Sequence, residues 1–475
     1  MKTDSEPTPL PTTRTPLMRR WINAMVDARR PQRWNWYAIV RPIDRRIATQ
    51  ADEPQAPDKI RSLRYFWLDG LFAAISENFY LGFVTLFALA YGASKGQVGL
   101  VTAAGNLLGA ISLFPGAQLV ERWGRRKAVV VWSGGGISRV ILLLMAVFPF
   151  FIDQPIWGIM AIVILNGLRA FTANLSNPAW TSMVADLVPN AMRGRYFSSR
   201  NVAMGLAALV VAPLAGRIIS AGNEWAHSSV FGYQVIFFLA FAFGMVSTFA
   251  FQRIAEPPMT EEEARPHQRG DLRRALRAHP EFVWLVIGAF VWNTALQIAA
   301  PFFNVYMVQA LGATTTMVGI VASISSLTSL IGQRFWGRWM DKKDAFWVQM
   351  VTGFLIPFLP FAWVFITQPW HVGIINTFGG FWWAGYNLAN FNLLLIMTPE
   401  DQRARAVALF QTAVFTSAVF GPILGGYLAD AVSFRLIFFL SFAGRMAGAV
   451  IFAWFVVRLY RRRSAQHILK EPSAA

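Results

Sequence analysis

The sequence predicts an all-α membrane protein with twelve transmembrane helices in two pseudo-symmetric six-helix bundles. Hydrophobic residues make up 55% of the 475 residues and charged residues only 14%, which is too apolar for a soluble chain of this length. About 20 helical residues cross a hydrocarbon core of about 30 Å. Roughly twelve apolar segments of that length are predicted, six on each side of a polar stretch at residues 252–280.

The two halves of the chain also share short motifs in the same order. Residues 92–101 read GASKGQVGLV and residues 312–321 read GATTTMVGIV. Residues 233–241 (YQVIFFLAF) are matched by residues 434–442 (FRLIFFLSF). A unit of several spans that is repeated in parallel predicts a carrier whose two bundles rock about a shared cavity.

Composition divides the chain into five segments. We expect a basic cytoplasmic tail over residues 1–62, bundles over 63–252 and 281–460, a cytoplasmic linker over 253–280 and a second cytoplasmic tail over 461–475. Before the first span, Trp and Arg mix in a Pro-interrupted stretch, which fits either a disordered tail or a helix lying on the membrane surface.

The formal charge of +18 comes from basic residues whose distribution along the chain fits a membrane topology. Lys and Arg gather in alternate loops and in both tails, which by the positive-inside rule puts both termini in the cytoplasm of a bacterial inner membrane. This alternation argues against nucleic acid as a partner. We expect a monomer whose partners are the lipid bilayer, a small-molecule solute and protons.

No enzyme site is predicted. The chain has no cysteine, and its five histidines are scattered over the linker, loops and tail, so no metal or cofactor site and no catalytic triad is expected. A phosphate-binding Walker pattern is also missing, which argues against an ATP-driven pump.

One loop carries a specific resemblance. Residues 117–127 read AQLVERWGRRK, similar to motif A of the major facilitator superfamily, Gly-x-Leu-x-Asp-Arg-x-Gly-Arg-Arg, with Ala117 and Glu121 as departures. The counterpart at residues 337–342 keeps the opening Gly and the acid but lacks the closing Gly-Arg-Arg. The resemblance extends over residues 63–460 and implies the twelve-helix fold of that superfamily and transport by alternating access.

Motif A predicts a cytoplasmic gate. An acid at the end of one helix can pair with an arginine, or with the positive N-terminus of a helix, in the opposite bundle. For the basic residues, simple topology signalling is the alternative role. The predicted gate residues are Glu121, Arg122, Gly124, Arg125, Gly337, Asp341, Lys342, Arg193 and Arg403.

The predicted solute cavity depends on polar residues near the middle of the spans. Glu77 lies halfway along the first span and Arg169 halfway along the fourth, where charge is costly and commonly functional. The resemblance implies that the first, fourth, seventh and tenth helices line the cavity. Its expected residues, besides Glu77, are Asn78, Arg169, Asn293, Gln297, Trp382, Trp383, Tyr386 and Asn387.

Glu77 is the predicted proton-coupling residue. A carboxylate in an apolar site can take a proton from one side and release it on the other, whereas Arg169 stays charged. The alternative is a static pair of Glu77 with Arg169, shared with Arg139. We expect Asp69 to cap or gate near the cytoplasmic end and Arg445 to make a peripheral helix contact.

The predicted function is secondary active transport of a small organic solute by alternating access, with proton coupling. A drug/proton efflux antiporter is one alternative, although the Gly-rich signature of its fifth span is degraded at residues 205–216. A non-transporting membrane sensor or scaffold is the other. The polar Glu77, Arg169 and Gln297 favour a transporter, because a transport-dead relative is expected to lose them.

Overall fold

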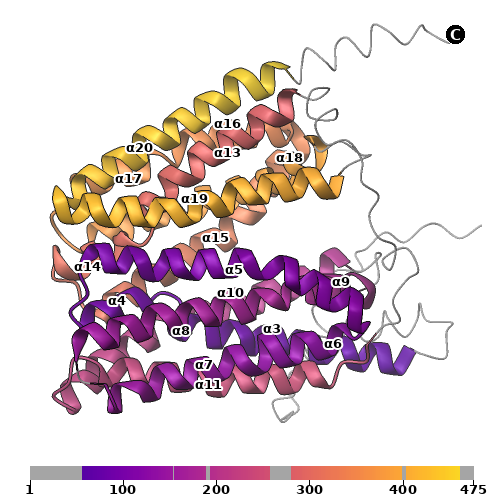
Figure 1. Cartoon of the computed structure of the whole chain (residues 1–475). Helices are drawn as coiled ribbons and strands as arrows, with labels where there is room; N and C mark the ends of the chain where they lie inside the picture. The colour runs from indigo at the N-terminus through magenta and orange to yellow at the C-terminus, as the bar shows by residue number, and fades with distance from the viewer. Residues whose placement is uncertain (1–55, 153, 189–192, 257–279, 398–402, 460–475) are drawn as a thin grey trace, which may run out of the picture. The chain divides into compact units, whose positions relative to one another are not determined.

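The computed structural model describes the chain except residues 1–55, 153, 189–192, 257–279, 398–402 and 460–475. Residues Arg61–Ala475 form one compact unit, and of the preceding unit, Met1–Ile60, only residues 56–60 are described. Nearly all of the predicted N-terminal tail, most of the linker and the C-terminal tail therefore lie outside the described residues. Every regular element in the described part is helical (Figure 1), which confirms the predicted fold class.

The first half supplies six spans, several of them interrupted. They are built from α3 (Ala56–Tyr80), α4 (Val84–Ala90), α5 (Lys95–Trp123), α6 (Arg126–Val129), the π-helix η2 (Val130–Ile137), α7 (Ser138–Val147), the 3-10 helix η3 (Phe148–Phe150), α8 (Pro155–Leu175), α9 (Asn177–Leu187), α10 (Arg193–Trp225) and α11 (Phe231–Gln252).

The second half repeats this order. It is built from α13 (Pro280–Ala299), α14 (Phe302–Gln309), α15 (Thr315–Lys343), α16 (Ala345–Leu355), α17 (Phe358–Trp363), α18 (His371–Met397), α19 (Arg403–Ala431), α20 (Phe434–Ile451) and the π-helix η6 (Phe452–Val456).

Eleven segments of the described chain are long and apolar enough to cross a membrane. The remaining long helix is α18, whose 27 residues are enough for a span but carry several asparagines. Amide side chains lower the mean hydropathy of a helix without shortening it, so α18 completes the predicted twelve spans. The asparagines of α18 are Asn376, Asn387, Asn390 and Asn392.

The repeated motif at residues 92–101 and 312–321 forms the same turn twice. Gly92 and Gly312 have φ of +84° and +66°, the left-handed region that glycine enters without steric cost. Two residues later, Ser94 accepts a hydrogen bond from the Gln97 N–H and Thr314 accepts one from the Met317 N–H. Each turn thus ends one helix and caps the next, α5 or α15.

Motif A and its partial copy also share a backbone turn. Gly124 ends α5 with φ of +59°, and Asp344 takes the corresponding place after α15 with φ of +118°. Asp344 holds this unusual conformation while its carboxylate caps α16 by accepting the Trp347 N–H at 2.7 Å. The second half therefore keeps the turn although it lacks the glycine.

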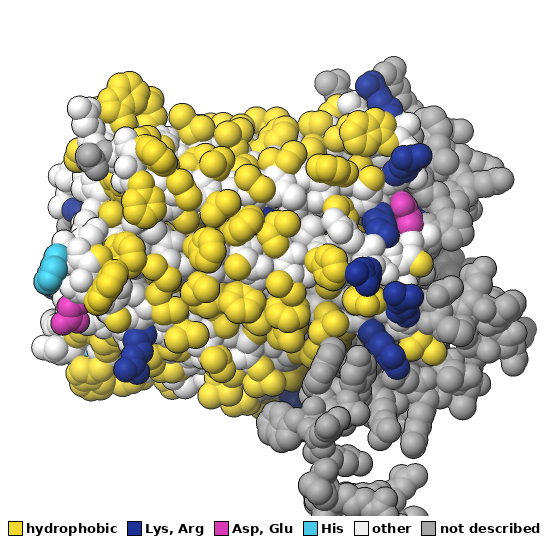
Figure 2. Space-filling model, turned by 90° about the horizontal axis from the view of Figure 1, so that it is seen from below, with side chains coloured by type: hydrophobic (Ala, Val, Ile, Leu, Met, Phe, Trp, Pro, Cys, Tyr) yellow, Lys and Arg dark blue, Asp and Glu magenta, His cyan; other side chains and the backbone are white. Residues whose placement is uncertain are grey.

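The two ends of the helical unit differ in charge and in contacts between the halves. We call the end with Arg122, Arg125, Arg338 and Lys342 the basic end, and the end with the Gly92 and Gly312 turns the far end. Figure 2 shows a face on which apolar side chains form a broad band, with Lys and Arg gathered toward one end. This band fits a helical surface in contact with lipid.

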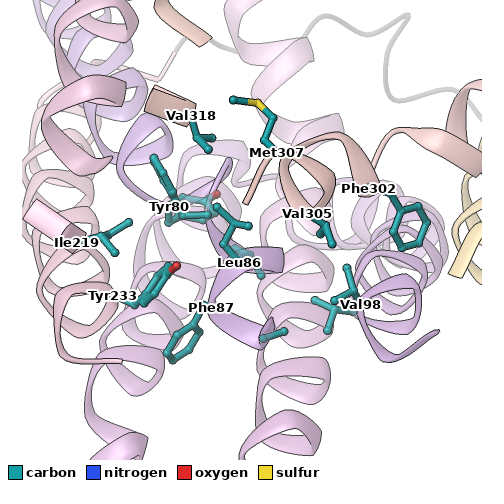
Figure 3. Packing of buried hydrophobic residues seen from close by; sticks show 14 of the residues in the cluster. Tyr80, Leu86, Phe87, Val98, Ile219, Tyr233, Phe302, Val305, Met307 and Val318 are labelled. Carbon is teal, nitrogen blue, oxygen red and sulfur yellow. The ribbon is translucent and has the colours of Figure 1, made fainter. Parts of the chain in front are cut away.

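An apolar cluster at the far end includes side chains from both halves. Tyr80, Phe87 and Val98 from the first half and Val305 and Met307 from the second belong to it (Figure 3). A described cluster nearer the basic end, around Phe282, Phe346 and Val456, comes from the second half alone. The halves are therefore joined mainly at the far end.

Small residues bring helices of the two halves close together there. A Cβ added to Gly319 of α15 would clash with the Ala212 carbonyl of α10, and one added to Gly216 would clash with the Thr315 carbonyl. The same holds across α5 and α19, where Gly99 lies against the Pro422 carbonyl. Small residues at such crossings allow backbones to approach without an intervening side chain.

Replacing Gly319 with valine should push α10 and α15 apart at the far end. Overpacking of this kind costs about 1 to 3 kcal/mol, because backbone atoms cannot move aside as a flexible side chain can. The expected result is a lower thermal-unfolding midpoint for the purified protein than for the parent.

The matched control is Gly353→Ala, because no atom lies within 4 Å of the added Cβ at Gly353. If Gly319→Val and Gly353→Ala unfold at the same temperature as the parent, the proposed close contact at Gly319 is wrong.

Candidate functional site

A cavity of about 310 Å³ lies inside the first half of the protein. Helices α3, α7, α8, α9, α10 and α11 and the π-helix η2 contribute its walls. Its ionisable lining residues are Asp69, Glu77, Arg139, Arg169 and Arg200. Ionisable groups between spanning helices are expected to pair with each other or to line a hydrated cavity, and both occur here.

Asp69 and Arg200 form a buried ion pair in this cavity. Both residues are 7% exposed, and the Arg200 Nη2 lies 3.7 Å from the Asp69 Oδ2. The other carboxylate oxygen accepts a hydrogen bond from the Ser247 hydroxyl at 2.6 Å. Asp69 thus links α3 to both α10 and α11. Its predicted role as a cap or gate remains a prediction, but it lies inside the bundle and not at a helix end.

Glycine at position 70 makes room for that pair. A Cβ on Gly70 would occupy the position of the Arg200 guanidinium. The same guanidinium lies over the Phe66 ring, with its Cζ 4.5 Å from the ring centroid. A cation over an aromatic face is attracted by the ring electrons, which adds to the pairing with Asp69.

Arg139 also enters the bundle where a glycine on a neighbouring helix leaves room for it. It follows the π-helix η2 on α7, and its Nη1 donates a hydrogen bond to the Ser76 hydroxyl at 3.0 Å. Ser76 in turn donates to the Ala240 carbonyl at 2.6 Å. A Cβ on Gly244 would lie 2.5 Å from the Arg139 Cδ, so glycine is needed there for the arginine to enter the bundle.

Arg169 is held by Tyr80 instead of by a carboxylate. Its Nη1 donates to the Tyr80 hydroxyl at 2.8 Å, and its Cζ lies 4.9 Å from the Tyr80 ring centroid. Arg169 also lines a second cavity of about 250 Å³ that Phe415 of the opposite half reaches. It therefore lies where a solute between the two halves could contact it.

Glu77 lines the first cavity with an exposed side chain. Among the described residues, no ion pair within 4 Å joins it to Arg169 or Arg139. The static Glu77–Arg169 pair, the alternative weighed above, is therefore not formed in this structure. The Glu77 carboxylate shares the lining of this cavity with the guanidiniums of Arg139 and Arg169.

The second half has its own cavity of about 280 Å³, lined by Trp383 and Arg445. The expectation that Arg445 makes a peripheral helix contact is wrong, because the residue is only 2% exposed and lies inside the bundle. Tyr386 stacks on Trp292 with ring centroids 4.8 Å apart, and Trp383 lies 5.4 Å from Tyr386. Trp383 and Tyr386, two of the three predicted aromatic residues of α18, thus form one group with Trp292, and Trp383 lines this cavity.

The other predicted cavity residues lie elsewhere. Asn78 and Asn293 donate their amides to carbonyls of their own helices, Ala74 and Ala289, each at 2.8 Å. Gln297 packs against Gly421 of α19, where an added Cβ would lie 2.5 Å from its own Cβ. Trp382 packs against Phe378, and Asn387 is exposed. Their assignment to the solute site remains a prediction.

The predicted gate residues lie at the basic end, and those whose side chains the structure describes are not packed against the opposite half. The side chains of Arg122, Arg125, Asp341 and Lys342 are exposed, as is Gly124, and an added Cβ on Gly337 would meet no atom within 4 Å. The side chains of Glu121, Arg193 and Arg403 lie outside the described residues.

Motif A contributes one buried ion pair at this end. The Arg126 guanidinium is fully buried and its Nη1 lies 2.6 Å from the Asp186 Oδ2. This pair joins α6 to α9 within the first half. Arg126 therefore has a packing role as well as its place in the basic loop.

At the far end a carboxylate joins the two halves. Asp430, at the end of α19, accepts hydrogen bonds from the Gly96 N–H at 2.7 Å and the Lys95 N–H at 3.2 Å. The Lys95 ammonium donates to the Ala429 carbonyl at 2.9 Å. An acid at a helix N-terminus is favoured by the free N–H groups and the helix dipole. We call these contacts of Asp430 and Lys95 the far-end latch.

Sequence reasoning missed both Arg200 and the far-end latch. Arg200 follows closely on the basic residues Arg193 and Arg195, which suggests a loop position, although it lies about two turns inside α10. A count of turns from the start of the helix is the signal that could have placed it inside the bundle. For Lys95, its partner on α19 could not be read from the sequence.

Comparisons with known proteins identify the family. A family model described as Major Facilitator Superfamily matches residues 66–395 and 295–474. The multidrug resistance protein MdtG of Dickeya zeae is 30% identical over 190 residues, which are 37% of this chain and 42% of the relative. A multi-drug resistance efflux pump PmrA homolog of Lactococcus lactis is 23% identical over 393 residues, covering 79% of this chain and 90% of the relative. The chain thus spans less than half the length of the MdtG relative.

Solved structures share the fold. A bacterial homolog of the human lysosomal transporter Spinster, in an inward-facing and occupied conformation, is 15% identical with a TM-score of 0.61, covering 88% of this chain and 99% of the other. A bacterial homologue of the iron transporter ferroportin, in an inward-facing state, is 17% identical with a TM-score of 0.62, covering 84% and 99%.

Removal of one partner of the Asp69–Arg200 pair should lower the stability of the protein strongly. Asp69→Asn leaves the Arg200 charge buried without a counter-charge, which costs about 3 to 5 kcal/mol for a buried pair. We expect a clear drop in the thermal-unfolding midpoint. The double variant Asp69→Asn/Arg200→Gln should recover part of the loss, because neither charge is then left alone.

Glu224→Gln is the control, since Glu224 is an exposed acid at the end of α10. Additive effects of the two substitutions in the double variant would contradict a direct interaction between Asp69 and Arg200.

Proposed function

Because the chain belongs to the Major Facilitator Superfamily, we propose that it carries a small organic solute across a membrane by alternating access, coupled to protons. Membership identifies it as an integral membrane transporter and not an enzyme. The observation that carries the finer proposal is the first-half cavity, in which the exposed carboxylate of Glu77 lies among guanidiniums between spanning helices. The transporting unit is the monomer, with bundles at residues 63–252 and 281–460.

The proposed orientation places the basic end in the cytoplasm of a bacterial inner membrane, with both tails on that side. The positive-inside rule supports it, since Lys and Arg concentrate there. In this orientation the far-end latch and the apolar cluster close the external side. The exposed gate residues Arg122, Asp341 and Lys342 then belong to a form that is open to the cytoplasm.

Proton coupling is assigned to Glu77. When Glu77 is ionised, it partly balances the charges of Arg139 and Arg169 in the same cavity. When it is protonated, those guanidiniums are left with a net positive charge, which favours an anionic solute. Proton binding and anion binding therefore support each other.

Helix α10 connects this cavity mechanically to the other half of the protein. It carries Arg200, which is paired with Asp69, and farther along it carries Gly216, which packs on α15. A rearrangement of charges in the cavity can therefore alter the contact between α10 and α15. Coupling by this route requires that α10 takes two positions, one for each charge state of the cavity.

Drug/proton efflux is the second candidate function. The names of the MdtG and PmrA relatives favour it, since both are described as multidrug proteins. The arginines of the first-half cavity disfavour a permanently cationic drug. A thermal-shift screen of the purified protein against sugars, organic acids, amino acids and hydrophobic cations at two pH values separates the two functions.

Glu77→Gln should abolish transport driven by a pH gradient and leave solute exchange largely intact, because the amide cannot carry a proton. The measurement is uptake in proteoliposomes, with and without an imposed gradient, of the solute that the screen selects. Glu224→Gln, which changes an exposed acid outside the cavity, serves as the control. Unchanged gradient-driven uptake in Glu77→Gln would remove Glu77 from the coupling mechanism.

The two ends should respond in opposite directions to loss of their acids. Asp430→Asn weakens the far-end latch by roughly 0.5 to 2 kcal/mol and should favour forms open to the outside. Asp341→Asn removes a proposed cytoplasmic contact and should favour forms open to the cytoplasm.

A single cysteine at Ala173, which lines the first-half cavity, reports the change in a chain with no native cysteine. Labelling by a membrane-impermeant maleimide from the cytoplasmic side should slow in Asp430→Asn and speed up in Asp341→Asn. Equal rates in both variants and in the parent would leave these acids without a gating role.

A further inference from the structure

The guanidinium of Arg445 is deeply buried in the second half of the protein. Arg445 lies on α20, is 2% exposed, and lines the cavity of about 280 Å³ between α13, α14, α15, α18 and α20. Cavities that bind small molecules in proteins measure about 300 to 1,000 Å³, so this one is near the lower limit. A compact solute fits this space better than a large multi-ring drug.

The charge of Arg445 has no counter-charge in the described structure. Its Nε and Nη2 are shielded from solvent and have no hydrogen-bond partner among the described residues. The described ionisable side chain that interacts electrostatically with it is Tyr386, whose hydroxyl is neutral in its protonated form. A buried cation without a partner costs several kcal/mol, so this arrangement calls for an anion from outside the chain.

The arginines of the first half differ in this respect. Arg200 is paired with Asp69, while Arg139 and Arg169 each donate a hydrogen bond to a hydroxyl and share their cavity with Glu77. Arg445 has neither kind of partner. It is therefore the guanidinium best placed to pair with a charge supplied by a ligand.

The residues that line the cavity indicate the chemistry of the part of the ligand that Arg445 does not bind. Aromatic and aliphatic side chains surround most of the space, and the amides of Asn304 and Asn376 supply hydrogen-bonding groups. A guanidinium binds carboxylates through two parallel N–H donors, while aromatic rings cover a flat apolar body. The apolar lining includes Phe303, Trp363 and Trp383.

We propose that this second-half cavity is a binding site for a small monocarboxylate with an apolar or single-ring body, held through its carboxylate by Arg445. The identification of this anion with the transported solute rests on the proposed transport function, but the binding itself does not. This site is distinct from the first-half cavity, where the proposed transport function has Arg139 and Arg169 favour an anionic solute when Glu77 is protonated.

The position of Asn304 connects this site to the contact between the halves. Its amide donates a hydrogen bond to the Gly82 carbonyl at 3.1 Å, in the break between α3 and α4 of the first half. Asn304 lies on α14, just after the matching break between α13 and α14. A carboxylate in the cavity therefore lies beside a residue that joins the two broken spans, as expected for sites built on discontinuous helices.

Thermal unfolding of the purified full-length protein tests the proposal with benzoate, phenylacetate and hexanoate, each compared with its neutral amide. At about ten times Kd, a carboxylate should raise the midpoint by about 1 to 2 °C, whereas its amide should not. Arg445→Gln should lose the shift. Arg435→Gln, an exposed arginine on the same helix, should keep it.

The ligand-free midpoint separates binding from a structural role. If Arg445 binds a ligand and has no structural role, Arg445→Gln should unfold at the same temperature as the parent or higher. The substitution then removes an unbalanced buried charge. If Arg445→Gln does not fold, Arg445→Lys supplies the test: a smaller benzoate shift supports the proposal and an unreduced shift overturns it.

Three other results would overturn the proposal. They are equal stabilisation by the amides, no stabilisation of the parent by any of the carboxylates, and a carboxylate shift that persists in Arg445→Gln. A shift lost in Arg169→Gln but kept in Arg445→Gln would place the carboxylate in the first half. Failure of the Glu77 transport test would leave these binding results unaffected, so the two ideas fail separately.

Discussion

The cost of charge among apolar helices is the constraint on which the rest of this structure depends. A charge inside a spanning segment needs a partner, a hydrogen bond or a hydrated cavity. The first half meets this need with the Asp69–Arg200 pair, with hydroxyl partners for Arg139 and Arg169, and with a cavity around them. Six helices and η2 line that cavity.

Glycine is the residue that makes this arrangement possible. Gly70 and Gly244 lie against Arg200 and Arg139, where any side chain would take the space of an arginine. At the far end, Gly216 and Gly319 instead let the backbones of α10 and α15 meet. Glycine thus serves charge burial inside a half and close helix packing between the halves.

The repeated scaffold carries different chemistry in its two copies. The turn glycines and helix caps at Gly92 and Gly312 are nearly equivalent, and both the first and seventh spans are broken near the same point. The buried charges do not follow this symmetry, because the first half mixes acids with arginines while Arg445 of the second half has no described acid beside it. In the proposals made above, the first half binds the proton, and the Arg445 cavity of the second half adds a site for a carboxylate.

Sequence patterns alone determined the features that depend on local composition. Apolar length predicted the spans, the repeat predicted two similar halves, and motif A predicted the family. The turns at Gly92 and Gly312 also follow from sequence, because glycine conformation and Ser or Thr capping involve neighbouring residues only.

Tertiary structure decided which way each polar side chain faces and what it meets. Arg200 belongs to a buried pair and not to a loop, Arg445 is interior and not peripheral, and Asn78 bonds to its own helix. Counting residues along a span gives the depth of a side chain but not the face of the helix that it occupies. That face, and the neighbour opposite it, are set by the packing of helices that lie far apart in the sequence.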